Sequence, residues 1–206
     1  MKVKWIILIA LLITAPTVMQ AQKMTYRWGV KTGLHFSHVS DFKESNGATG
    51  YHMGGPVVEF MQKKFSSTGV EAALLYSRKG FDFDDKNLKR VMNDYIEIPV
   101  NLKWRLNVPL VSPYIAMGPY ANVVLGGEKK DYGKYSVDPS PVNFGLGFSA
   151  GLDIIHVQLS LNFNWGLNDT YKITPISSSQ ETGYGTTSSE FSVKDRTFAL
   201  SAAFLF

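Results

Sequence analysis

The amino-acid sequence predicts an all-β fold: an eight-stranded antiparallel up-and-down transmembrane β-barrel with short periplasmic turns and longer external loops. Three observations lead to this prediction. Residues 157–165 alternate without interruption between large apolar and small polar side chains, which is the pattern of a strand with one apolar and one polar face. Similar runs recur eight times along the 206 residues. The connections between them alternate long and short, beginning and ending with a long one.

The N-terminal segment has the pattern of an export signal. Two lysines precede an apolar run at residues 5–13, which is too short to cross a bilayer as a helix. Cleavage is expected between Ala21 and Gln22. We therefore expect a signal peptide over residues 1–21 and an outer-membrane β-barrel domain over residues 22–206. A membrane anchor that stays attached is the alternative.

The first three predicted strands alternate between apolar and polar residues, the second less regularly than the others. Each carries charged side chains on its polar face. These strands and charged residues are, in order, 26–36 with Arg27 and Lys31, 50–61 with Glu59, and 68–78 with Glu71. Residues 62–64 form a short polar turn after the second strand, and a long charged connection, residues 81–93, follows the third.

The remaining five strands continue the pattern. The fourth, sixth, seventh and eighth alternate cleanly, whereas Pro119 and interrupting glycines leave the faces of the fifth undecided. Their ranges are 95–106, 113–125, 142–154, 157–165 and 196–206. Residues 126–141 and 166–194 are expected to be long loops.

The pattern favours a membrane barrel over a water-soluble one. Strands of about 10–12 residues suit a tilted crossing of the apolar layer. The apolar faces are rich in Trp, Phe, Leu and Ile, and together they would crowd the small interior of a soluble barrel. The alternative is a secreted, lipocalin-like lipid-binding barrel whose apolar faces point inward.

Four short runs resemble one family. They are residues 29–37, residues 95–103, which begin Tyr-Ile-Glu-Ile-Pro, residues 113–119, and the terminal Phe-Leu-Phe ending at Phe206. These runs look like the PorT-type outer-membrane β-barrel family, and the resemblance covers nearly all of the mature chain. It implies an eight-stranded barrel in a Gram-negative outer membrane and a link to protein secretion. It supplies no catalytic residues.

Six charged residues are predicted to face the lumen near the periplasmic end. Three are cations and three are carboxylates, and they are Arg27, Glu59, Glu71, Lys103, Arg105 and Asp153. An eight-stranded barrel has an interior just wide enough for side chains to fill, so buried charges there must pair. We expect a structural cluster of ion pairs that fills the lumen. The alternative is a gated pore or proton path.

Five aromatic residues lie near strand ends on the apolar faces. They are predicted to form interfacial girdles, with Trp28, Trp104 and Phe206 at the periplasmic rim and Tyr76 and Trp165 at the outer rim. In the lipocalin-like alternative they would be ordinary core aromatics.

Composition excludes several functions. The chain has no cysteine, which removes disulfides and thiolate chemistry, and its net charge of +4 does not argue for nucleic acid as a partner. The four histidines do not have a metal-binding spacing, and Asp82, Asp84 and Asp85 lack the remainder of a calcium loop. We expect no metal and no cofactor. An enzyme would need a catalytic group at the outer rim, for which the candidates are Ser37, His38, Asp41, Ser188 and Ser189.

The expected function is therefore non-enzymatic: a membrane-embedded structural or interaction component of the cell envelope. Both termini are expected in the periplasm. The expected partners are outer-membrane lipid, the barrel-insertion machinery acting on the C-terminal strand, and other envelope or secretion proteins. The alternative function is a narrow channel for ions or small solutes.

Overall fold

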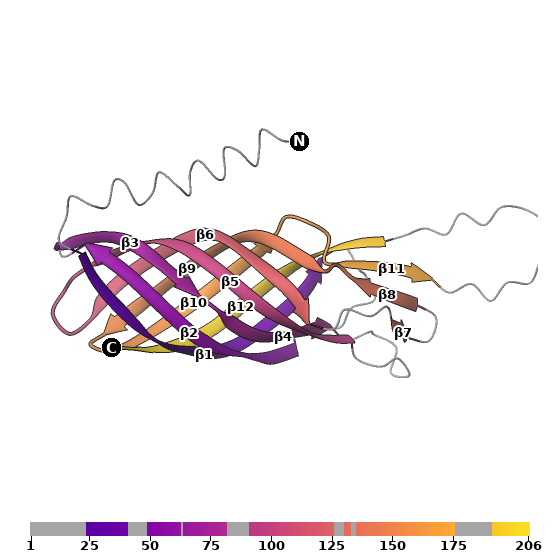
Figure 1. Ribbon diagram of the computed structural model, residues 1–206, viewed down its shortest axis with the longest axis horizontal. Helices are drawn as coiled ribbons and strands as arrows, with labels where there is room; N and C mark the ends of the chain where they lie inside the picture. The colour runs from indigo at the N-terminus through magenta and orange to yellow at the C-terminus, as the bar shows by residue number, and fades with distance from the viewer. Residues whose placement is uncertain are drawn as a thin grey trace, which may run out of the picture.

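The computed structural model describes residues 24–40, 49–62, 64–81, 91–125, 130–132, 135–175 and 191–206. The described residues form twelve strands (Figure 1). Their bounds are β1 Met24–Ser40, β2 Thr49–Gln62, β3 Ser66–Ala73, β4 Leu75–Phe81, β5 Val91–Leu106, β6 Ser112–Leu125, β7 Lys130–Tyr132, β8 Tyr135–Pro139, β9 Val142–Ile154, β10 Val157–Gly166, β11 Tyr171–Pro175 and β12 Phe191–Leu205. The expected signal peptide, residues 1–21, lies outside the described residues.

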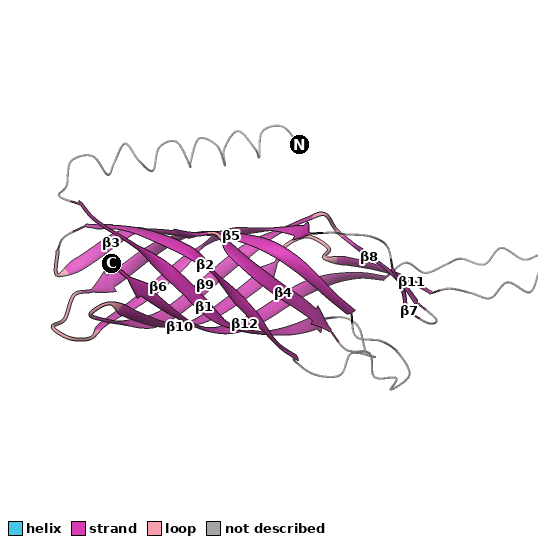
Figure 2. Ribbon diagram, turned by 60° about the horizontal axis from the view of Figure 1, so that its bottom comes forward, coloured by secondary structure: helices cyan, strands magenta, loops and turns pink. Residues whose placement is uncertain are grey.

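The strands close into an antiparallel barrel. Around the barrel the order is β1, β2, β3 with β4, β5, β6, β9, β10 and β12, and β12 pairs again with β1. Because β4 continues the line of β3, these two segments act as one strand of the wall. The barrel therefore has eight wall strands, which we call staves, as predicted. Figure 2 shows these tilted staves without a helix among the described residues. No described helix is long and apolar enough to span a membrane.

The two faces of each stave have opposite chemistry. On β10, Leu161 and Phe163 are exposed on the outside, whereas Ser160 and Asn164 are buried in the lumen. The other staves repeat this division, because a strand turns alternate side chains to opposite faces. The apolar faces therefore point outward, which is the reverse of the lipocalin-like alternative.

The lumen is not uniformly polar. A strip of apolar side chains covers the inner face of β2, β3, β4 and β12, and it consists of Met53, Val57, Ala73, Leu75, Ala199, Ala203 and Leu205. On β6, whose faces the sequence left undecided, Tyr114 and Tyr120 point inward and are buried. A Cβ on Gly151 would lie 2.7 Å from the Tyr114 ring, so glycine on the facing strand β9 leaves room for the tyrosine.

The predicted third strand is divided at Leu74 into β3 and β4. The Leu74 amide donates to Pro56 O at 3.0 Å, but Pro56 has no N–H with which to return the bond. On the other side lies β5, where Val100 pairs with Ala72. The next residue of β5 is Pro99, which also has no backbone N–H to donate. Two prolines beside the same position therefore interrupt the ladder without changing its register.

Two predicted loops contain strands. In the range expected to be the loop 126–141 the chain forms β7 and β8, and in the range expected to be the loop 166–194 it forms β11 and the first residues of β12. These segments pair in the order β12, β11, β8 and β7. The resulting sheet extends the barrel beyond the end opposite the C-terminus (Figure 1). The prediction of loops was wrong for residues 130–132, 135–139, 171–175 and 191–194, because short runs such as Tyr171-Lys-Ile pair with segments far along the chain.

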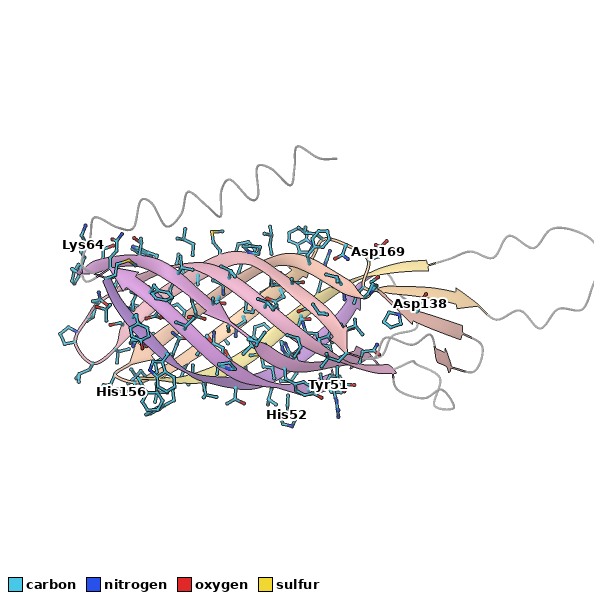
Figure 3. All side chains as sticks on the ribbon, viewed as in Figure 1. Tyr51, His52, Lys64, Asp138, His156 and Asp169 are labelled. Carbon is cyan, nitrogen blue, oxygen red and sulfur yellow. The ribbon has the colours of Figure 1, made fainter. Side chains whose placement is uncertain are left out.

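The other end of the barrel carries the short connections. They are the turns between β2 and β3, between β5 and β6, and between β9 and β10, and we call this the turn end. The C-terminus lies there, because Phe206 N donates to Trp28 O at 2.7 Å. Lys64 and His156 mark the turn end in Figure 3, and Asp138 and Asp169 mark the opposite end.

Candidate functional site

The lumen near the turn end contains a connected network of ion pairs. All six charged residues predicted to face the lumen belong to it, and they come from β1, β2, β3, β5 and β9. Glu59 lies at its centre, with contacts of 2.7 Å to Arg27, 2.5 Å to Lys103 and 3.1 Å to Arg105. One carboxylate thus bridges three cations on two other strands.

Asp153 extends the network across the lumen. Its Oδ2 accepts hydrogen bonds from Arg27 and, at 2.6 Å, from Arg105. Because β9 is not adjacent to β1 or β5 in the barrel, these bonds cross the interior rather than follow the wall. The network therefore ties together opposite sides of the barrel.

Lys31 is a seventh member, which the sequence analysis placed on the polar face of its strand but did not include in the cluster. Its Nζ lies 2.5 Å from Glu71 Oε1, while Glu71 Oε2 lies 3.0 Å from Lys103. The network so contains the four cations Arg27, Lys31, Lys103 and Arg105 and the three carboxylates Glu59, Glu71 and Asp153. Its formal charge is +1.

A second polar group lies further from the turn end. Lys79 Nζ is 2.7 Å from Glu97 Oε2, and Asn164 donates to Glu97 Oε1 at 3.2 Å. The ring of His35 lies 4.0 Å from the same carboxylate. The sequence analysis missed this group because Lys79 lies one residue beyond the predicted end of its strand. Both Lys79 and Glu97 are buried.

The five aromatic residues predicted to form girdles all point outward and are exposed on the apolar surface. At the turn end the Trp28 and Phe206 rings lie 5.1 Å apart, and Trp104 Nε1 donates to Ser66 Oγ at 2.8 Å. Towards the opposite end, the Arg196 guanidinium lies 5.8 Å from the Trp165 ring. Tyr76 lies beside Arg78, which donates to its hydroxyl at 3.3 Å.

The residues considered for other chemistry do not form a described site. Ser37 and His38 lie on β1, but the structure describes only their backbone. Asp41, Ser188, Ser189, Asp82, Asp84 and Asp85 lie outside the described residues. Within the described part of the chain, no group of three His, Asp or Glu side chains could hold a metal ion.

Comparison with known families identifies the fold. A model of the outer membrane protein beta-barrel domain family matches residues 20–172, which is most of the chain. The chain belongs to this family. As an outer membrane protein beta-barrel domain, it presents its apolar outer faces to the hydrocarbon layer of that membrane.

Solved structures of small outer-membrane barrels are similar to this domain. OprG from Pseudomonas aeruginosa has a TM-score of 0.51 and 12% identity, over 89% of this chain and 95% of OprG. Neisserial surface protein A has a TM-score of 0.46 and 12% identity, over 90% of this chain and 100% of its own. Ail of Yersinia pestis has a TM-score of 0.42 and 14% identity, over 88% and 99%. The likeness to OprG shows a shared fold. No curated protein matches the chain.

Proposed function

We propose that this barrel is a membrane-embedded structural and interaction component of the cell envelope, with a lumen closed by ion pairs and no enzymatic activity. The observation that carries the proposal is the network around Glu59, whose bonds join β1, β2, β5 and β9 across the interior. Removing one partner of a buried ion pair leaves an uncompensated charge, so these side chains are expected to stay in place across the closed interior. Such a lumen holds the wall together rather than conducting solute.

We further propose that the chain is of the PorT type and works with envelope or secretion proteins. The Tyr95-Ile-Glu-Ile-Pro run supports this assignment, because three of its residues lie at structurally distinct places in the barrel. Tyr95 and Glu97 are buried in the lumen, and Pro99 faces the interruption between β3 and β4. The run therefore combines two buried lumen residues with a proline beside the strand interruption, a combination that alternation alone does not require.

The proposed orientation places the turn end in the periplasm and the β7, β8 and β11 extension outside the cell. Short turns at one end and long connections at the other support this orientation. Phe206 follows directly on the C-terminal strand β12 and lies on the outer face, where we propose that the insertion machinery recognises it. Outer-membrane lipid covers the rest of that face.

A narrow channel is the second candidate. Its support is that the amides of Asn143 and Gln158, both buried in the lumen, have no hydrogen-bonding partner among the described residues. Buried amides of this kind are normally satisfied by water, so the lumen has polar positions outside the ion-pair network.

The experiment that tests the interaction role is purification from detergent-solubilised envelopes. We expect a defined envelope or secretion protein to copurify with the intact chain at constant stoichiometry, and the chain to fractionate with outer membranes. Recovery of the barrel alone under mild detergent, together with ion flux through vesicles that contain it, would favour the channel instead.

A further inference from the structure

The turn end contains an open pocket over the ion-pair network. Its volume is about 260 Å³, and its floor consists of Arg27, Arg105 and Asp153. Around it lie three apolar residues from two different turns, Val108, Leu110 and Ile155, and two polar residues, Asn107 and Ser112. Cationic groups at the base of an apolar rim are an arrangement suited to a partner that is itself acidic and apolar.

The two arginines at the floor are the part of the network that solvent reaches. Their side chains are 18% and 13% exposed, whereas those of Lys31 and Lys103 are 6% and 0% exposed. Arg27 uses Nε and Nη2, and Arg105 uses Nε and Nη1, in their hydrogen bonds. Nη1 of Arg27 and Nη2 of Arg105 have no partner among the described residues. Of the charged residues that line the pocket, two are cationic and one is acidic, and the arginine N–H groups without a partner can donate to a ligand at this mouth.

The most exposed rim residues are apolar, although turns are normally polar. Leu110 is 74% exposed and Ile155 is 66% exposed. Both also have a left-handed backbone, with φ of 70° at Leu110 and 56° at Ile155. Leucine and the β-branched isoleucine adopt this conformation at a cost in free energy that glycine or asparagine avoids. Each position thus combines an exposed apolar side chain with a backbone conformation that disfavours it, and strained residues of this kind cluster at functional sites.

The turns that carry the rim are held in place before any partner arrives. Asn107 N donates to Phe65 O at 2.7 Å, and Asn107 Nδ2 donates to Ser67 Oγ at 2.5 Å, which joins two of the three turns. The third is fixed to the last strand, because Leu205 N donates to His156 O at 2.8 Å. A surface ordered in advance loses little conformational freedom on binding.

We propose that this pocket is the docking site for an acidic apolar segment of another envelope protein, which places a carboxylate over Arg27 and Arg105 and apolar side chains against Leu110 and Ile155. The inference rests on the interaction role proposed above and on the turn end facing the periplasm. A carboxylate suits these donors, because hydrogen bonds between charged groups are stronger than neutral ones.

The first experiment places a photo-crosslinking amino acid at Leu110 in the full chain in intact cells. The same group at Leu161, on the lipid face, and at Leu167, at the opposite end, serves as control. We expect Leu110 to give an adduct with a protein segment that carries Asp or Glu next to apolar residues, identified by mass spectrometry. Adducts at Leu110 with lipid alone, with a second copy of this chain, or with a segment that lacks a carboxylate would overturn the docking site.

The second experiment measures binding of a synthetic peptide of the crosslinked segment to the purified barrel. Leu110→Gly and Ile155→Gly should each weaken binding by about tenfold through lost apolar contact. Neither should lower the stability of the barrel, because glycine adopts the left-handed conformation without penalty. Leu167→Gly should bind like wild type, and replacing the acidic residue of the peptide by its amide should weaken binding. Equal binding of all three variants would contradict the proposal.

The two proposals fail in different ways. Protein adducts at Leu167 together with lipid adducts at Leu110 would leave the interaction role intact and remove the docking site at the turn end. Absence of protein adducts from both ends would remove both.

Discussion

Glu59 on β2 and Lys103 on β5 form an ion pair at 2.5 Å inside the barrel, although their strands are not neighbours. Their side chains are 1% and 0% exposed. The contact spans the inner face of β3, which separates the two strands. It makes the lumen wall one connected unit instead of a set of paired strands.

Removing the carboxylate at the centre of the network should strongly destabilise the barrel. Glu59→Gln leaves Arg27, Lys103 and Arg105 underpaired in a closed interior, and we expect the free energy of unfolding to fall by about 3–5 kcal/mol. Urea titration in lipid vesicles measures this change. The matched control is Asp94→Asn, whose partner Arg78 lies 2.7 Å away in an exposed position. That loss should be about 1 kcal/mol or less.

Lys31 and Glu71 allow a cleaner measurement of one pair. The two side chains form a buried ion pair at 2.5 Å, and Glu71 is the residue with which Lys31 pairs. Lys31→Met and Glu71→Gln should each destabilise the barrel, whereas the double variant should recover about 0.5–3 kcal/mol relative to their sum. Strict additivity in a double-mutant cycle would show that water screens the pair and that the lumen is open.

The outer face should reject charge at mid-strand. Leu161 is exposed to lipid near the middle of β10, so Leu161→Arg should lower the free energy of unfolding by about 2–4 kcal/mol. Its neighbour Asn162 points inward and donates to Ser201 Oγ at 2.8 Å. The effect of Asn162→Arg should instead depend on space and pairing in the lumen. Normal folding of Leu161→Arg together with failure of Asn162→Arg would mean that the faces are inverted.

Two adjacent glycines on β2 should respond in opposite ways to alanine. A Cβ at Gly55 would lie 2.1 Å from Leu74 O, so Gly55→Ala should cost about 1–3 kcal/mol of stability. A Cβ at Gly54 would find its nearest atom at 3.6 Å, an ordinary contact. Gly54→Ala should be neutral or stabilising by about 0.4–1 kcal/mol, because it restricts the unfolded chain. A neutral result for Gly55→Ala would show that the Leu74 carbonyl lies further from Gly55 than described.

The sequence was sufficient to predict the barrel and the two faces of every barrel strand except β6. Period-two alternation is a local property. It assigns residues such as Leu161 and Asn162 to the outer or inner face without information about the adjacent strands. The same parity placed Glu59, Lys103 and Asp153 on the inner face. It could not state that Asp153 reaches Arg27, because the distance across a closed interior depends on register and stagger, which alternation does not specify.

Other features depend on contacts between distant segments. Lys31 was assigned to the polar face, but only the packed lumen shows that its long side chain reaches Glu71. The sheet of β8, β11 and the start of β12 pairs segments that are far apart along the chain, such as Ile173 with Val137. The division at Leu74 requires Pro56 on β2 and Pro99 on β5 to flank the same part of the strand between them, which no single segment reveals.

The most direct test of the closed lumen is single-channel recording of the purified, refolded protein in a planar lipid bilayer. The ion-pair network predicts no steady current for the wild-type barrel, because charged side chains from β1, β2, β3, β5 and β9 occupy the interior near the turn end. A steady wild-type current whose size or selectivity changes in Glu59→Gln would contradict the account and make the lumen a pore.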